Sequence, residues 1–98
     1  MIVIPEPIQF AWDEANKDKN FMKHHVTNEE AEEIFADPNK KIFTDRLHSL
    51  NEVRFRIIGR TKKARLLFIV FTIRTEHVRI ISARDINKKE VFLYEKKA

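Results

Sequence analysis

The sequence predicts an α+β domain: a small antiparallel sheet with two helices before it and one helix after it. Residues 66–73 form an uncharged run of branched aliphatic and aromatic side chains, which has the length and composition of a strand. This run does not alternate polar with apolar residues, so we expect it to be covered on both faces. Residues 52–59 alternate with period two and residues 78–83 are again β-branched, so both should flank it as strands.

A first helix is expected from residue 13 to about residue 25, with Asp13 as its N-cap. Residues spaced i, i+3 and i+7 lie on one side of a helix, which predicts a polar face here. This face comprises Lys17, Asn20 and His24. Phe21 and Met22 are expected to supply a thin apolar face.

Capping boxes predict the starts of the other two helices. In the first box, Thr27 is the N-cap and Glu30 stands three positions later; in the second, Asn87 and Glu90 have the same spacing. The apolar residues expected to be buried are Ala31, Ile34 and Phe35 in one helix and Val91, Leu93 and Tyr94 in the other. Residues 36–39 contain a proline and should end the earlier helix.

Further strands are expected at residues 8–12 and 42–44, and within residues 52–59 the alternation assigns two faces. One face carries Val53, Phe55 and Ile57, and the other carries Glu52, Arg54 and Arg56. Gly59 is the only glycine, so we expect it to hold a backbone angle that other residues avoid.

The 98 residues fit a single domain spanning residues 1–98. The absence of cysteine excludes disulfides and thiolate metal sites, and it is consistent with a reducing compartment. The N-terminus lacks a basic region followed by a long apolar one, and no apolar run has the length of a membrane span. We therefore expect a cytoplasmic protein.

Charge is distributed unevenly along the chain. Residues 1–51 contain six Lys and Arg against ten Asp and Glu, a net charge of −4, whereas residues 52–84 contain nine against two, a net charge of +7. A basic sheet beside an acidic helical half could bind a polyanion on one side. The alternative is that these arginines only keep the exposed strand faces soluble.

Several kinds of site are disfavoured. The four histidines have no metal-ligand spacing such as HExxH, so we predict no metal site. One glycine cannot form a glycine-rich phosphate loop, and no serine lies in a nucleophile elbow. No cofactor is therefore expected.

The remaining charged residues suit RNA cleavage without a metal. That reaction needs a base for the 2′-hydroxyl, an acid for the departing 5′-oxygen and cations for the phosphate. Glu52 or a histidine could be the base, and Lys23, His24 or His48 the acid. The arginines that could hold the phosphate are Arg54, Arg74, Arg79 and Arg84, with Arg56 as a further RNA contact. Each of these residues could instead have only a structural role, such as an ion pair between Glu52 and Arg54.

The chain also resembles a known family. The opening pattern comprises Trp12-Asp13, Asn20, Lys23-His24, Val26, Glu30-Ala31 and Phe35. The middle comprises Asp45, His48, Glu52, Arg54 and Gly59, and the end comprises Thr72, Arg74, residues 79–84 (RIISAR), Glu90 and Tyr94. In this order the residues are similar to those of the BrnT toxins, over residues 10–94.

This resemblance implies a RelE-like fold and a ribonuclease toxin of a type II toxin–antitoxin system, similar to an mRNA interferase and encoded beside a BrnA-like antitoxin. Two positions depart from the family pattern. The family usually has glycine where this chain has His25, so a left-handed helix end there would strain His25. The family tends to show Asp-x-Arg-His where this chain has Asp-Arg-Leu-His, so we assign Arg46 no role.

The sequence leaves two hypotheses about the function. The first is an endoribonuclease that needs no metal and leaves a 2′,3′-cyclic phosphate. The alternative is a non-catalytic module that binds RNA or the antitoxin. Strand alternation also predicts that residues 78, 80, 82 and 84 share a face, so Arg79 and Arg84 should not line one groove unless a bulge intervenes. The antitoxin is expected to compete with RNA for the basic sheet.

Overall fold

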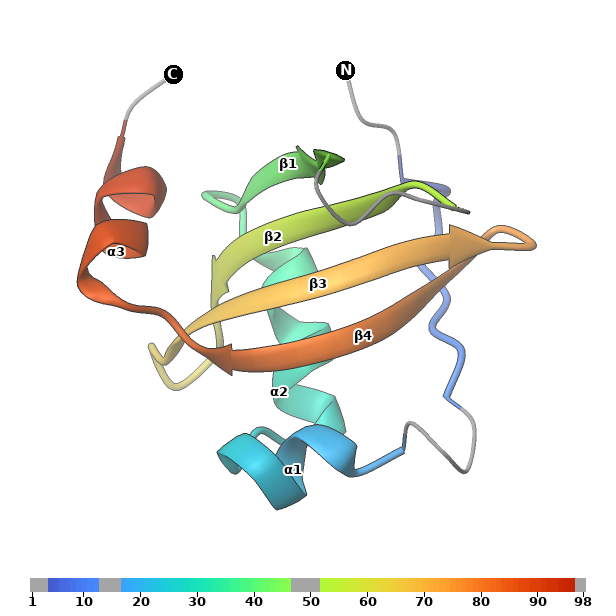
Figure 1. Ribbon diagram of the computed structural model, residues 1–98, viewed down its shortest axis with the longest axis horizontal. Helices are drawn as coiled ribbons and strands as arrows, with labels where there is room; N and C mark the ends of the chain where they lie inside the picture. Colours follow the sequence, from blue (N-terminus) through green and yellow to red (C-terminus); the bar gives the residue numbers. More distant parts are fainter. Residues whose placement is uncertain (1–3, 13–16, 47–51, 97–98) are drawn as a thin grey trace.

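The chain folds into one four-stranded antiparallel sheet with helices behind it and a further helix at one end. A computed structural model describes residues 4–12, 17–46 and 52–96. In chain order the elements are α1 (Lys19–His24), α2 (Asn28–Glu33), the 3-10 turn η1 (Ile34–Ala36), β1 (Lys41–Asp45), β2 (Arg54–Arg60), β3 (Leu66–Arg74), β4 (His77–Asp85) and α3 (Lys88–Glu95). The strands are ordered β1-β2-β3-β4 (Figure 1). This arrangement confirms the predicted α+β fold with a small antiparallel sheet.

The core lies between one face of the sheet and the helices α1 and α2. Both predicted capping boxes are present: Thr27 Oγ1 accepts from the Glu30 amide at 3.0 Å, and Asn87 Oδ1 accepts from the Glu90 amide at 2.9 Å. The predicted triplet of the second helix is buried against the sheet. The sheet supplies Ile57, Leu67, Ile69, Phe71, Val78, Ile80 and Ala83 to this core.

The other face of the sheet is more open than the sequence predicts. In β3, Leu67, Ile69 and Phe71 are fully buried, but Phe68 and Val70 on the opposite face are only half-buried. The expectation that β3 is covered on both faces is therefore wrong at these two positions. Arginines on β2 and β4 flank Phe68 and Val70 on this face, and their side chains shield the two apolar residues in part from water.

The first helix differs from its prediction in length and in orientation. It begins at Lys19, and Asp13 lies outside the described residues. Asn20 is 3% exposed and accepts a hydrogen bond from the Ala83 amide at 2.9 Å, while Phe21 and Met22 are 47% and 81% exposed. The predicted polar and apolar faces are therefore wrong. A buried amide on the edge strand β4 needs an acceptor, and Asn20 provides one.

Gly59 is required for space, and the expectation of an unusual backbone angle is wrong. Its φ is not positive, but a Cβ there would lie 2.8 Å from Ile34 Cβ and 2.9 Å from the Ile34 carbonyl oxygen. The absent side chain lets η1 approach β2. At the end of α1, by contrast, His25 has φ 55° and ψ 34°, which confirms the left-handed helix end expected there.

Two smaller elements also depart from expectation. Residues 8–12 make a single parallel bridge, between Phe10 and Val78, instead of a regular strand. In α3, Tyr94 is buried, donates to Asp37 Oδ2 at 2.7 Å and has the guanidinium carbon of Arg60, in β2, 5.7 Å from its ring centre. Leu93 is 43% exposed and does not dock on the sheet. Among the described residues, no helix is long and apolar enough to cross a membrane.

Candidate functional site

A bulge in β4 determines which charged side chains share the open face of the sheet. Val70 pairs with Ser82 and Phe71 pairs with Ile80, so Ile81 is one extra residue on β4. Because of this insertion, Ile80 and Ala83 both lie in the core, and Ser82 and Arg84 turn to the open face with Arg79. The expectation that residues 78, 80, 82 and 84 share one face is therefore wrong beyond the bulge.

The open face carries a groove of about 400 Å³. Its floor is apolar and is formed by Phe68 and Val70 from β3 and by Ile81 from β4. The other side chains that line it are Asp45, Arg54, Arg56, Ser82 and Arg84. A pocket of this size holds a small ligand, and an apolar floor with an arginine rim suits a flat, partly apolar and negatively charged one.

One end of the open face holds a carboxylate among arginines. Arg74 Nε and Nη2 donate to the two carboxylate oxygens of Glu52 at 2.8 and 2.7 Å. These hydrogen bonds are the largest influence on the pKa of Glu52, and with the positive charges of Arg54 and Arg79 they lower it below its ordinary value of 4.5. Glu52 is therefore ionised at neutral pH.

The other half of the groove is organised by Arg84. Its Nη1 and Nη2 donate to both oxygens of Glu90 at 2.9 and 2.8 Å, and Nη1 also donates to the Asp85 carbonyl oxygen at 3.0 Å. The guanidinium carbon lies 4.2 Å from the centre of the Phe68 ring. Burial alone would raise the pKa of Glu90, but the hydrogen bonds from Arg84 and the Asn87 amide outweigh it and lower that pKa.

Arg56 lies in the same half of the groove. Its Nε is buried and, among the described residues, has no hydrogen-bond partner. A buried donor without an acceptor is uncommon in a folded protein and calls for a group that could satisfy it.

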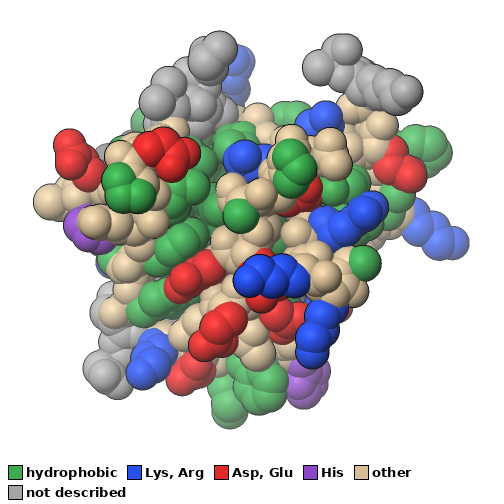
Figure 2. Space-filling model, turned by 180° about the vertical axis from the view of Figure 1, so that it is seen from behind, with side chains coloured by type: hydrophobic (Ala, Val, Ile, Leu, Met, Phe, Trp, Pro, Cys, Tyr) green, Lys and Arg blue, Asp and Glu red, His purple; other side chains and the backbone are tan. Residues whose placement is uncertain are grey.

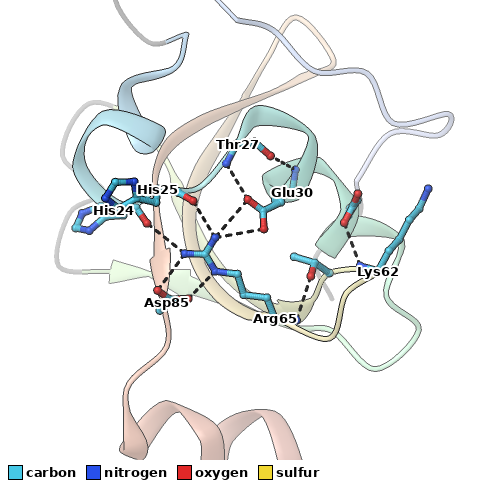
Figure 3. A network of polar contacts seen from close by, with 9 residues as sticks. His24, His25, Thr27, Glu30, Lys62, Arg65 and Asp85 are labelled. Carbon is cyan, nitrogen blue, oxygen red and sulfur yellow. Dashed lines mark hydrogen bonds and ion pairs between the residues drawn. The ribbon is translucent and has the colours of Figure 1, made fainter.

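A second arginine cluster, centred on Arg65, lies on the helical side (Figure 3). Arg65 donates to both carboxylate oxygens of Asp85 at 2.7 and 3.0 Å, and to the carboxylate of Glu30 at 3.2 Å. It also donates to the carbonyl oxygens of His25 and His24 at 2.9 and 3.2 Å. The side chain thereby ties the end of α1 to the start of α2 and to β4.

Sequence reasoning did not identify Arg65 as important. Four of its partners lie 20 to 41 positions away along the chain, so no local motif marks it. The groove residues Phe68 and Ser82 were missed for a similar reason, because the bulge that brings them together is not visible in the residue order.

The structure divides the predicted site residues into three groups. Glu52, Arg54, Arg74 and Arg79 lie together, as the effects on the Glu52 pKa show. Arg56 and Arg84 line the groove farther along the open face, and Arg54 belongs to both regions. His48 lies outside the described residues.

Lys23 and His24 form the third group, on α1. The His24 carbonyl contacts Arg65, just before β3, whereas Glu52 contacts Arg74 at the end of β3. These two arginines are nine positions apart along the strand, which is roughly 30 Å at about 3.3 Å per residue. The structure therefore does not bring Lys23 and His24 together with the Glu52 cluster.

The helical side has a different electrostatic character from the open face. Seen from behind, acidic and basic side chains are interspersed there (Figure 2). The acidic residues of α2 take part in local contacts: Glu32 accepts from the Trp12 indole at 2.7 Å and Glu33 from the Lys62 amide at 3.0 Å. Within the described ranges, no three His, Asp or Glu side chains are grouped so that they could hold a metal ion.

Comparison with protein families gives a match over most of the chain. Residues 12–90 match the model of a family described as the ribonuclease toxin BrnT of type II toxin–antitoxin systems. A search of curated proteins finds no significant match. The matched range covers most of the chain and includes the groove and the Glu52 cluster.

Proposed function

Since the chain belongs to the BrnT family of type II ribonuclease toxins, we propose that it is an endoribonuclease of the mRNA-interferase type that cuts RNA at the Glu52 end of the open face. In this proposal cleavage needs no metal ion and leaves a 2′,3′-cyclic phosphate. The observation that carries the proposal is the position of the ionised Glu52 beside Arg54, Arg74 and Arg79. It combines a proton acceptor with cations that can hold a phosphate.

In the proposed reaction, the Glu52 carboxylate takes the proton of the 2′-hydroxyl. The 2′-oxygen then attacks phosphorus, and the bond from phosphorus to the 5′-oxygen breaks. The arginines stabilise the negative charge that builds on the phosphate oxygens, as preorganised donors do in other sites. A general acid protonates the departing 5′-oxygen, and His48 is our candidate because it stands four positions from Glu52 in the sequence.

The hydrogen bonds between Glu52 and Arg74 have a direct consequence for this mechanism. While Arg74 binds both carboxylate oxygens, Glu52 is a weakened base. A scissile phosphate that takes over the guanidinium of Arg74 would release the carboxylate for the 2′-hydroxyl. Arg74 would thus exchange one anionic partner, the Glu52 carboxylate, for another, the scissile phosphate.

A type II toxin has an antitoxin partner as well as its RNA substrate. We propose that the partner is BrnA-like, that both proteins act in the cytoplasm, and that the antitoxin presents carboxylates to the open face. Replacing Arg54 and Arg74 by Glu should then weaken both RNA and antitoxin binding. Antitoxin binding as tight as that of the parent, by a variant that no longer binds RNA, would place the antitoxin elsewhere on the toxin.

Incubation of the purified protein with RNA in excess EDTA tests the central claim. We expect cleavage to persist, with cyclic product ends that acid hydrolyses to a mixture of 2′- and 3′-phosphates. The E52Q variant, purified in the same way, controls for contaminating nucleases. Cleavage that stops when EDTA is added would contradict the mechanism, and RNA that is bound but never shortened would favour the non-catalytic binding module.

A further inference from the structure

Arg84 is held within the protein by hydrogen bonds to the segment of chain that follows it. Both terminal nitrogens are engaged by Glu90 and by the Asp85 carbonyl. The carboxylate also compensates the charge of the guanidinium. A phosphate would have to displace these contacts to bind Arg84. The flat face of the guanidinium does not take part in hydrogen bonds, so it can stack on a planar group.

The guanidinium plane lies over an aromatic ring in the groove. Arg84 sits 4.2 Å from the Phe68 ring centre and its side chain is 37% exposed, while the rest of the floor is aliphatic. Unstacked RNA bases are recognised by stacking on aromatic rings and on arginine planes. The volume of about 400 Å³ is also in the range of pockets that hold a small ligand.

We propose that Arg84 and Phe68 form a stacking platform for one nucleobase of the RNA, and that this platform contributes to the base preference of the enzyme. The inference rests on the proposed ribonuclease function and assigns Arg84 to base binding instead of phosphate binding.

The spacing along β3 places this base away from the cut itself. Phe68 precedes Thr72 by four residues, which is roughly 13 Å of strand, and Thr72 pairs with Arg79 of the Glu52 cluster. The base on the platform therefore belongs to a nucleotide that neighbours the scissile phosphate. Arg54, which belongs to both regions, connects the platform with the site of cleavage.

Stacking and phosphate binding predict different salt dependence. A phosphate contact on single-stranded RNA contributes a slope of about −0.7 in log affinity against log salt, because it releases counterions. A guanidinium that is already paired with Glu90 and stacks on a base should contribute affinity without contributing to this slope. Arg84 and Arg54 can therefore be distinguished by measuring binding at several salt concentrations.

The test measures binding of a short RNA that is made resistant to cleavage by 2′-deoxy substitution at the cut. The same RNA is then measured with an abasic nucleotide placed at each position beside the cut in turn. For the RNA without an abasic nucleotide, we expect R84K to lose about tenfold in affinity with an unchanged salt slope. At one abasic position, the parent protein should lose a similar factor and R84K should lose nothing further. R54A, the matched control, should lower the slope and weaken both RNAs equally.

F68L examines the same platform without touching the Arg84–Glu90 pair, and it removes the ring while keeping an apolar floor. It should reproduce the R84K pattern, with both variants folded by circular dichroism. Equal losses for R84K on normal and abasic RNA, with a shallower salt slope, would overturn the platform and make Arg84 a phosphate contact. Failure of the parent protein to bind or cut any RNA would instead overturn the ribonuclease proposal, and the platform with it.

Discussion

Two arginine–carboxylate clusters occur at the two ends of the same strand, and they differ in what surrounds them. Arg65 stands just before β3 and Arg74 is its last residue. Each makes a pair of short hydrogen bonds to one carboxylate, on Asp85 and on Glu52 respectively. Arg65 is 26% exposed and Arg74 is 53% exposed.

The difference shows how the same chemical pair can serve structure or function. Around Arg65, the other acceptors are a second carboxylate, from Glu30, and the carbonyls of His24 and His25, so the cluster satisfies groups that folding brings together. Around Glu52, three arginines lower its pKa, and Asp45 pairs with one of them, Arg54, so cations outnumber carboxylates among these described residues. An excess of cations is suited to recruiting an anionic substrate, and a balanced cluster is suited to holding segments in place.

The largest expected effect is on catalysis at the Glu52 end. E52Q should lower the rate of RNA cleavage by about 10²–10⁴-fold, the range of a lost general base. The free energy of unfolding should change by less than about 1 kcal/mol, because the pair is exposed. Cleavage assays and urea unfolding of the same preparations check both values, and an E52Q protein with normal activity would remove Glu52 from the mechanism.

The Arg65 end should show the reverse behaviour. R65A leaves two carboxylates and two helix-end carbonyls without their donor, which we expect to cost about 2–3 kcal/mol. R65K keeps the charge but cannot reproduce the forked geometry, so its loss should be smaller. Thermal unfolding is the measurement, with R74A as the matched control at the other end of β3. A similar fall in Tm for R65A and R74A would show that the two clusters contribute equally to stability.

Acid should also affect the two ends unequally. Hydrogen bonds from Arg65 lower the pKa of Asp85 below 3.8, and those from Thr27 and Arg65 outweigh burial to lower the pKa of Glu30 below 4.5. A carboxylate with a lowered pKa contributes stability that is present at neutral pH and is lost as pH falls through its folded pKa. The parent should thus lose stability below about pH 4.5.

R65A removes the cause of much of this shift, so its free energy of unfolding should fall less between pH 7 and pH 3 than that of the parent. Urea titrations at these two pH values provide the measurement. R74A removes the hydrogen bonds that do most to lower the pKa of Glu52, and it is the comparison variant. An R65A protein as acid-sensitive as the parent would show that other carboxylates dominate acid unfolding.

The smallest expected effects are on stability, and they concern the residues with left-handed backbone conformation near the two ends of β3. His25 has φ 55° at the end of α1, and Glu76 has φ 64° in the turn after β3. Glycine removes the cost of this conformation but loses more entropy on folding. We therefore expect H25G and E76G to stabilise the protein by at most about 0.5 kcal/mol. The His25 ring lies edge-on to Phe21 at 5.6 Å, so the gain there should be the smaller one. Destabilisation by E76G in thermal unfolding would contradict this account.

Local patterns predicted much of the fold because their causes are local. The capping boxes at Thr27 and Asn87 involve residues three positions apart, and both form as the sequence indicates. The alternation in β2 also predicted which side of the sheet carries Arg54 and Arg56. By contrast, the faces of α1 were predicted wrongly, since a long-range hydrogen bond to Ala83 orients Asn20 inward.

The candidate site was predictable in its charge but not in its arrangement. The excess of arginine in residues 52–84 indicated a basic sheet, and the grouping of Glu52 with Arg54, Arg74 and Arg79 follows from strands that are neighbours. The separation of Lys23 and His24 from this group depends on where α1 packs. Residue order does not contain that information.

The sequence by itself determined the four strands of the sheet, the starts of α2 and α3, the charge of the sheet and the family to which the chain belongs. Tertiary structure alone decided the register of β4, where the bulge at Ile81 turns Ser82 and Arg84 toward the groove. It also decided that Gly59 is needed for the close approach of Ile34. The reason is that register and close packing depend on contacts between segments distant in sequence, whereas propensity and capping act within a few residues.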